Sequence, residues 1–224
     1  MRRPFPLRRS RSLRRDTGGG VMIEFAFVAP VLLIAGLGSL ELANLTLAYM
    51  RVSDIAIKVA DNSARVRVSI DESDINEIFT GAKEMGKPIN FAANGRIILS
   101  SVEPLVGGTP PKVTNQYLRW QRCTGAYPVN STHGSEGDGA TGTGQAAGYG
   151  VPGGGKIQAS MNSAVMLAEV VYKYQPLISD GWFGPIVIRQ VKSMPVRQRT
   201  DQIVKNGSNL PAASRMLCSN PYAA

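Results

Sequence analysis

Spacings typical of nucleotide-binding loops occur in a glycine-rich run between positions 134 and 156. Within it, residues 150–156 fit G-x-x-x-x-G-K, the spacing with which a phosphate-binding loop surrounds a nucleotide. The next residue is Ile157, so the hydroxyl that would hold magnesium is missing, and Pro152 interrupts an overlapping G-x-G-x-x-G. Because so dense a run satisfies many glycine templates by chance, we expect no nucleotide binding. We interpret residues 134–155, which contain ten glycines, as a mobile loop that packs against nothing.

Candidate catalytic and metal-binding groups are few. His133 is the only histidine and lies beside the glycine-rich run, a poor place to hold a general base. The acids Asp71, Glu72 and Asp74 are better explained as charges at the start of a helix than as acid/base pairs. Two cysteines and one histidine cannot complete a four-ligand zinc site. The sequence therefore predicts no enzyme, no cofactor and no metal site.

The basic charge belongs to the N-terminal segment. The formal net charge of the 224 residues is +9, but residues 1–19 alone contain seven arginines and one acid, Asp16. The rest of the chain has 18 basic and 15 acidic residues, or +3. This distribution gives no support to a nucleic-acid-binding domain, which would spread its charge over a folded face. A disordered arginine tail that binds RNA or acidic lipid is the alternative for this segment.

An apolar helix must follow this tail. From Val21 to Met50 only Glu24 and Glu41 are charged, so residues 20–50 have the length and composition of a transmembrane helix, with Pro30 inside it. The apolar positions of residues 51–65 then follow helical spacing, so we expect one long helix that continues as an amphipathic stem. A charge inside an apolar helix costs about 2.5 to 3.5 kcal/mol near the membrane centre, so Glu24 needs an explanation.

Three interpretations of this helix compete. A secretory signal peptide would be removed near Thr46-Leu47-Ala48 and would discard a pattern that continues past that site. A plain single-pass anchor explains the apolar run and the arginines, which mark a cytoplasmic flank, but leaves Glu24 without a role. At this depth Glu24 could also be a solvated residue at the level of the lipid headgroups.

The third interpretation comes from a resemblance. The segment "GGVMIEFAFVAP" resembles the leader region of type IVb pilins and, more closely, the TadE-like minor pseudopilins of tight-adherence (Tad or Flp) pilus systems. The resemblance implies that a prepilin peptidase cuts between Gly19 and Gly20. Glu24 then becomes the fifth mature residue and Phe25 the sixth. It also implies that Glu24 sets subunit register by pairing with the freed amine of a neighbouring subunit.

The same resemblance implies a location and partners. The chain would lie in the inner membrane as a single-pass protein with a cytoplasmic N-terminus, and its C-terminal domain would be periplasmic or part of the pilus. Its partners would be the prepilin peptidase, other pilins and minor pseudopilins, and the inner-membrane assembly platform. Three segments follow: a basic leader at 1–19, a transmembrane helix at 20–50, and an exported domain at 51–224.

The exported domain has the pattern of an α+β fold. A short helix is expected to end near Gly86, and four strands are expected at 95–105, 112–123, 163–178 and 185–196. A helix followed by strands with short links favours a small antiparallel sheet, on which the long helix packs in a manner similar to pilins. The alternative function is a periplasmic enzyme or ligand-binding domain on an uncleaved anchor, which a deep pocket with converging polar groups would favour.

The two cysteines, Cys123 and Cys218, both lie on the side predicted to leave the cytoplasm. An even number of cysteines in an oxidising compartment favours a disulfide, and two unpaired buried thiols are the alternative.

Overall fold

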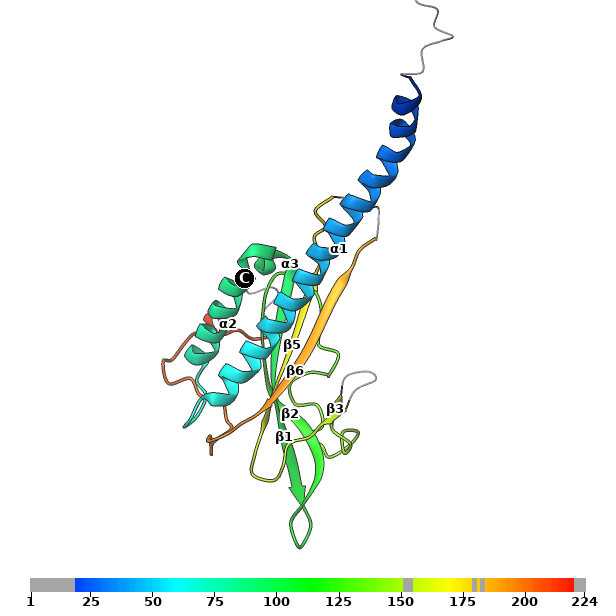
Figure 1. Cartoon of the computed structure of the whole chain (residues 1–224). Helices are drawn as coiled ribbons and strands as arrows, with labels where there is room; N and C mark the ends of the chain where they lie inside the picture. Colours follow the sequence, from blue (N-terminus) through cyan, green and yellow to red (C-terminus); the bar gives the residue numbers. More distant parts are fainter. Residues whose placement is uncertain (1–18, 151–154, 179–180, 182–183, 220–224) are drawn as a thin grey trace, which may run out of the picture. The chain divides into compact units, whose positions relative to one another are not determined.

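A computed structural model describes residues 19–150, 155–178, 181 and 184–219 (Figure 1). The chain divides into two compact units, one up to Asn44 and one from Leu45 onward, and each is considered by itself. The predicted basic leader, apart from Gly19, lies outside the described residues. The described part has the predicted α+β composition, with one long helix, shorter helices and an antiparallel sheet.

The first helix, α1, runs from Gly19 to Arg65 and includes Pro30. The apolar segment and the amphipathic stem are therefore one helix, as predicted. In the second unit, the predicted apolar face of the stem is fully buried. Its members are Val52, Ile55, Ala56, Val59, Ala60 and Ala64.

The second helix, α2, spans Glu72–Gly86, and its start is fixed by a capping box. The Asp71 carboxylate accepts a hydrogen bond from the Ser73 backbone N–H at 3.0 Å, while Asp74 accepts one from the Asp71 N–H at 2.9 Å. These two bonds satisfy donors that have no partner inside the helix, which explains the helix start. The interpretation of Asp71 and Asp74 as helix-start acids is confirmed.

The sheet has four antiparallel strands in the order β2-β1-β5-β6. The strands are β1 (Gly95–Gly107), β2 (Lys112–Thr124), β5 (Val165–Lys173) and β6 (Val187–Pro195). All four lie within or close to the predicted ranges. β5 ends earlier than predicted, before Pro176, whose backbone has no N–H to donate to a ladder.

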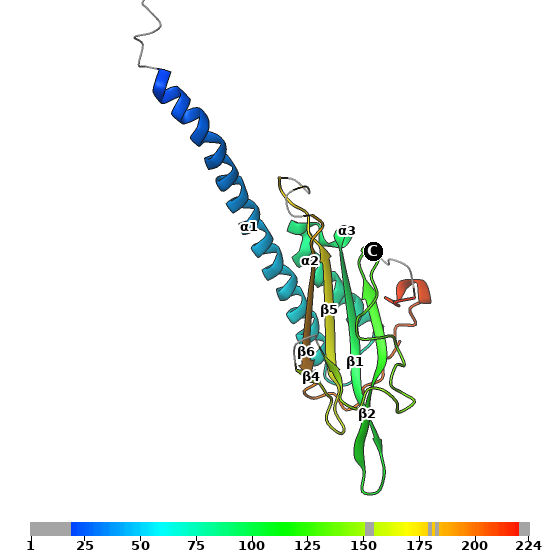
Figure 2. The ribbon, with the colours of Figure 1, turned by 90° about the vertical axis from the view of Figure 1, so that its right-hand side faces the viewer.

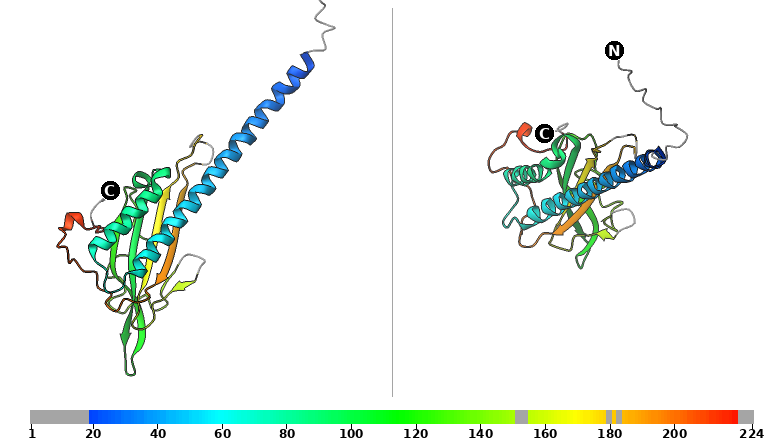
Figure 3. Two further views of the ribbon diagram at one scale, coloured as in Figure 1. Left: turned by 60° about the vertical axis from the view of Figure 1, so that its left-hand side comes forward. Right: turned by 45° about the horizontal axis from the view of Figure 1, so that its top comes forward.

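One face of the sheet packs against α2 and the part of α1 after Leu45 (Figure 3). Alternate residues of β5, namely Met166, Ala168 and Val170, share this core with Ile55 and Phe79 of the helices. Burial of these apolar side chains, each worth about 1.5 to 3 kcal/mol when complete, is what holds the stem on the sheet.

The opposite face of the sheet is covered as well, which the sequence interpretation missed. Val165 and Leu167 of β5 form a second buried cluster with Val102, Leu118 and Tyr149. The strands β3 (Tyr149–Gly150) and β4 (Lys156–Ile157) pair with each other in this covering segment. The domain therefore has helices on one face of the sheet and irregular chain on the other (Figure 2).

The hairpin of β1 and β2 extends past the other strands (Figure 1). β5 pairs with β1 only as far as Val102, whereas the β1–β2 ladder continues to Gly107. The remaining short elements are η2 (Lys87–Ile89), α3 (Phe91–Asn94) and η3 (Ala212–Ser214).

Candidate functional site

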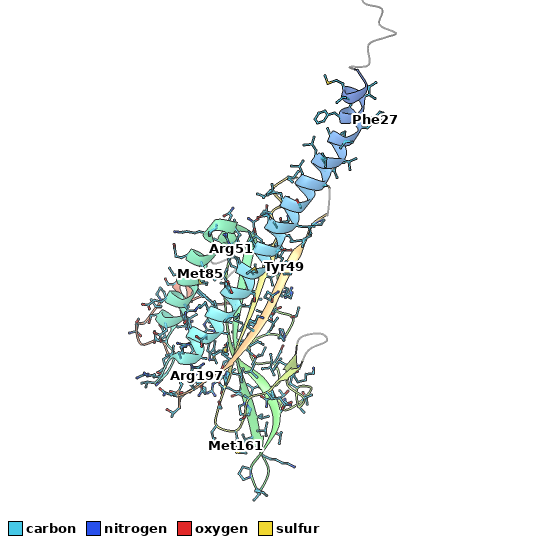
Figure 4. All side chains as sticks on the ribbon, viewed as in Figure 1. Phe27, Tyr49, Arg51, Met85, Met161 and Arg197 are labelled. Carbon is cyan, nitrogen blue, oxygen red and sulfur yellow. A yellow bond between two sulfur atoms is a disulfide. The ribbon has the colours of Figure 1, made fainter. Side chains whose placement is uncertain are left out.

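The first unit presents an apolar surface to its surroundings. Among the described helices, α1 is the one long and apolar enough to cross a membrane, and its apolar window has no residue buried within the protein. Phe27, for example, is 76% exposed and projects from the helix (Figure 4). A run of exposed apolar side chains is unfavourable in water, and the length and composition of this part of α1 suit a membrane or contact with other apolar helices.

The residues of the predicted processing site lie at the start of α1. Gly19 and Gly20 are exposed and belong to the first helical turn, and a Cβ atom at either position would meet no heavy atom within 4 Å. The local surroundings therefore do not require glycine at these two positions. Without side chains, these two glycines leave the backbone at the start of α1 uncovered.

Glu24 lies one turn further along and is also exposed, as is Phe25. Within the part of the chain that the structure describes, the Glu24 side chain has no hydrogen bond or ion pair. The structure thus brings Gly19, Gly20, Glu24 and Phe25 together in the first two turns of one exposed helix. A carboxylate on an apolar helix, without a side-chain partner among the described residues, is a candidate for pairing between chains.

The second unit contains a buried polar cluster centred on Glu169 of β5. Its carboxylate accepts hydrogen bonds from the hydroxyls of Ser131 and Thr132, both at 2.8 Å. His133 Nδ1 lies 3.4 Å from it, and the Arg189 guanidinium of β6 forms an ion pair with it. Burial would raise the pKa of Glu169, but the bonds from His133, Ser131 and Thr132 and the charge of Arg189 outweigh this and hold the pKa at about 2.

His133 is therefore not beside a flexible run, as the sequence suggested, but buried against the sheet. Its Nε2 has no hydrogen-bond partner among the described residues and is inaccessible to solvent. A general base must reach a substrate, and in the described structure the Nε2 atom of His133 does not reach the surface. The cluster instead attaches residues 131–133 to the middle of the sheet.

A second polar connection joins α2 to β2. Arg122 donates to both carboxylate oxygens of Glu72, with Nε at 2.9 Å and Nη2 at 2.6 Å from the oxygens, and both side chains are buried. Arg122 also contacts Glu136 at 3.1 Å. Glu72 is thus more than the helix-start charge that the sequence indicated. It holds α2 to the sheet through a bidentate ion pair.

The two cysteines form the predicted disulfide, Cys123–Cys218, across a sequence separation of 95 residues. The Cys123 N–H donates to Met216 at 2.7 Å, and Asn76 of α2 donates to the Ser214 carbonyl at 3.0 Å. The segment before Cys218 is therefore fixed along β2 and α2.

The prediction that the glycine-rich segment packs against nothing is wrong for its described part, residues 134–150 and 155. Leu118 of β2 donates to the Asp138 carbonyl at 2.9 Å and accepts from Gly137 at 2.7 Å. A Cβ atom at Gly139 would collide with the Gln116 carbonyl oxygen. Several of these glycines have positive φ angles or allow two backbones to approach closely. They therefore serve the packing of this segment and do not indicate that it is mobile.

A cavity of about 580 Å³ lies between these segments on the face of the sheet opposite the helices. It is lined by Arg96 and Gln121 of the sheet, by residues 129–131 and 134–136, and by the disulfide with its neighbours Leu217 and Ser219. The volume is within the range of small-molecule sites. In the described residues no three His, Cys, Asp or Glu side chains are grouped so that they could hold a metal ion.

The fold and the exposed helix together define a class: an α+β domain whose first helix begins as an apolar, membrane-compatible segment. Residues 19–61 match the family model of the TadE-like proteins, and this confirms the resemblance on which the sequence interpretation relied. The match covers α1 except for its last turn and none of the sheet. No curated protein and no solved structure that was compared is significantly similar to the chain.

Proposed function

We propose that this protein is a minor pilin-like assembly protein of a Tad-type pilus, anchored in the inner membrane, which acts by subunit packing after its leader is removed. The match of residues 19–61 to the TadE-like family, over the helix whose apolar side chains are exposed, carries this proposal. The family associates with other pilus components, and an exposed apolar helix is the surface by which such association would occur.

Processing is the first step of the proposed mechanism. The prepilin peptidase cuts between Gly19 and Gly20 on the cytoplasmic side, where the arginines of the leader hold the chain by the positive-inside rule. The domain after the helix lies in the periplasm. The cut removes seven arginines and creates an amine at Gly20.

Packing is the second step. The mature helix inserts among the helices of other pilins and minor pseudopilins, in contact with the assembly platform. Glu24 pairs there with the amine of a neighbour. Because opposite charges in a low-dielectric setting stabilise each other only when they meet closely, this pair fixes the register of the two helices.

Two substitutions separate these steps. Glu24→Gln keeps the side-chain shape and removes the charge, so insertion and cleavage should proceed while co-purification with pilin partners is lost. Gly19→Leu should block cleavage and leave residues 1–19 attached. Glu84→Gln, an exposed carboxylate on α2, is the matched control and should behave as the wild type. Normal co-purification of both Glu24→Gln and Gly19→Leu would refute the mechanism.

A second candidate function rests on the cavity of about 580 Å³. Its size and its polar wall residues favour a ligand-binding domain on an uncleaved anchor. The two functions differ in one observable: the ligand-binding alternative keeps Met1 through Gly19 on the mature chain and needs no partner for Glu24.

A further inference from the structure

The two edges of the four-stranded sheet differ: in the described chain, one edge is hydrogen-bonded to other segments and the other is not. The outer edge of β2 is hydrogen-bonded to two other segments: Leu118 to residues 137–138, and Cys123 to Met216. The outer edge of β6 has no such cover, since no described residue outside the sheet donates to or accepts from the backbone of residues 187–194. An open edge is a ready template for another strand.

The register shows which backbone groups of β6 point outward. Tyr174 donates to the Ile186 carbonyl and Val196 donates to the Ala164 carbonyl, each at 2.9 Å. In an antiparallel ladder the hydrogen-bonded pairs recur at every second residue, so the even-numbered residues of β6 bond to β5. The odd-numbered residues 187, 189, 191 and 193 therefore present their N–H and C=O groups to the outside. Four residues of unpaired backbone are enough for a short added strand.

The side chains along this edge are basic. Arg189 and Lys192 lie on β6 itself, and Lys173 of β5 lies opposite Val187. Arg197 lies two residues after the strand, with its side chain 60% exposed and its Nη2 3.7 Å from the Asp61 carboxylate of α1. Arg189 forms its ion pair with Glu169, which is buried in the sheet and is not accessible to an incoming strand. An acidic segment would be attracted to this edge.

A second copy of this chain is a poor partner for the same edge. Two copies of β6 that pair with each other would bring two basic strands together, and like charges in opposed positions destabilise a sheet. Pro195 also has no N–H, which closes the ladder at that end. Charged and proline residues at an edge work against self-pairing and leave pairing with an acidic strand possible.

We propose that β6 is a docking site for an acidic, extended segment of another protein, which adds a fifth strand to the sheet. Backbone hydrogen bonds to residues 187, 189, 191 and 193 supply the attachment, and the surrounding lysines and arginines select the partner by charge. This inference goes beyond the proposed function, because it concerns the folded domain and does not depend on leader cleavage or on Glu24.

Hydrogen exchange on the full-length chain in detergent micelles tests the site. The probe is a synthetic nonapeptide in which glutamates alternate with valines, and the comparison peptide has lysine in place of each glutamate. In the free protein the odd-numbered amides of 187–193 should exchange faster than the even-numbered ones. The acidic peptide should slow the odd-numbered amides at least tenfold, and the lysine peptide should leave them unchanged.

Two variants sharpen this test. Ser193→Pro removes an outward N–H group without removing a hydrogen bond to β5. Lys192→Glu reverses a charge at the edge. Each variant should bind the acidic peptide at least tenfold more weakly than the wild type does. Lys87→Glu, on an exposed lysine beyond α2, is the matched control and should bind like the wild type. If Ser193→Pro fails to fold, binding of the acidic peptide by Lys192→Glu is the deciding measurement.

Three results would overturn the proposal. The first is equal protection by both peptides, and the second is protection by neither. The third is a dimer in which the odd-numbered amides are protected without any peptide, because the edge would then belong to a second copy.

Discussion

Replacing Glu169 by glutamine should change the pH dependence of stability in a defined way. The folded carboxyl keeps its charge down to a pKa of about 2, whereas in the unfolded chain it takes up a proton near 4.5. Because the folded pKa is lowered, the charged group stabilises the fold fully above pH 4.5, and this contribution is lost as the pH falls toward 2. The pKa difference corresponds to about 3 kcal/mol, and the side chain is buried, so solvent screening does not reduce it strongly.

Denaturant unfolding of the detergent-solubilised full-length chain measures this quantity. The difference in unfolding free energy between the wild type and Glu169→Gln should be largest at pH 6 to 7 and should shrink by about 3 kcal/mol on going to pH 2. Glu84→Gln, on an exposed carboxylate, should show a difference that stays nearly constant with pH. A difference for Glu169→Gln that is equally flat would mean that Glu169 is not held as a buried carboxylate, and the account of the cluster would fail.

Three further predictions concern stability at neutral pH. Arg122→Met removes the bidentate partner of the buried Glu72 carboxylate and leaves it only Arg215, at 3.9 Å, so it should cost about 3 to 5 kcal/mol in chemical unfolding, whereas a loss below about 1 kcal/mol would show that the Arg122–Glu72 pair is not buried. Gly139→Val meets β2 backbone and a positive φ and should lower the melting temperature by several degrees more than Gly144→Val, which has positive φ but open space; equal effects would count against packing of the loop. Cys218→Ser opens a long loop and should lose at most about 4 to 5 kcal/mol, and labelling of both thiols in the unreduced wild type would exclude the bridge.

The helices and the main strands could be predicted because their determinants are local. The spacing of Ile55 and Val59 along the stem reports a helical face whatever that face contacts. The acids before Ile75 mark a helix start through the capping box, which involves neighbours in sequence. In the same way, the resemblance around Glu24 depends on a short contiguous segment, and the family match covers that segment.

The missing parts depended on contacts between distant residues. Glu72 looked like a helix-start acid because Arg122, its partner, lies 50 positions away. His133 and the glycine-rich run looked mobile because composition does not record backbone hydrogen bonds such as that from Leu118 to Asp138. One sequence feature could have indicated the second buried face: β5 reads "VMLAEVVYK", nearly continuous in apolar residues, and a strand exposed on one side would alternate.

The mature N-terminus is the most direct test of the proposed function. Intact-mass and N-terminal peptide mass spectrometry would be carried out on the full-length protein purified from cells with an active prepilin peptidase. We expect a chain that begins at Gly20 in these cells and a chain that retains residues 1–19 when the peptidase is inactivated. A protein that keeps Met1 through Gly19 in the presence of the active peptidase would contradict the account, because no amine would then form for Glu24 of a neighbouring subunit to meet.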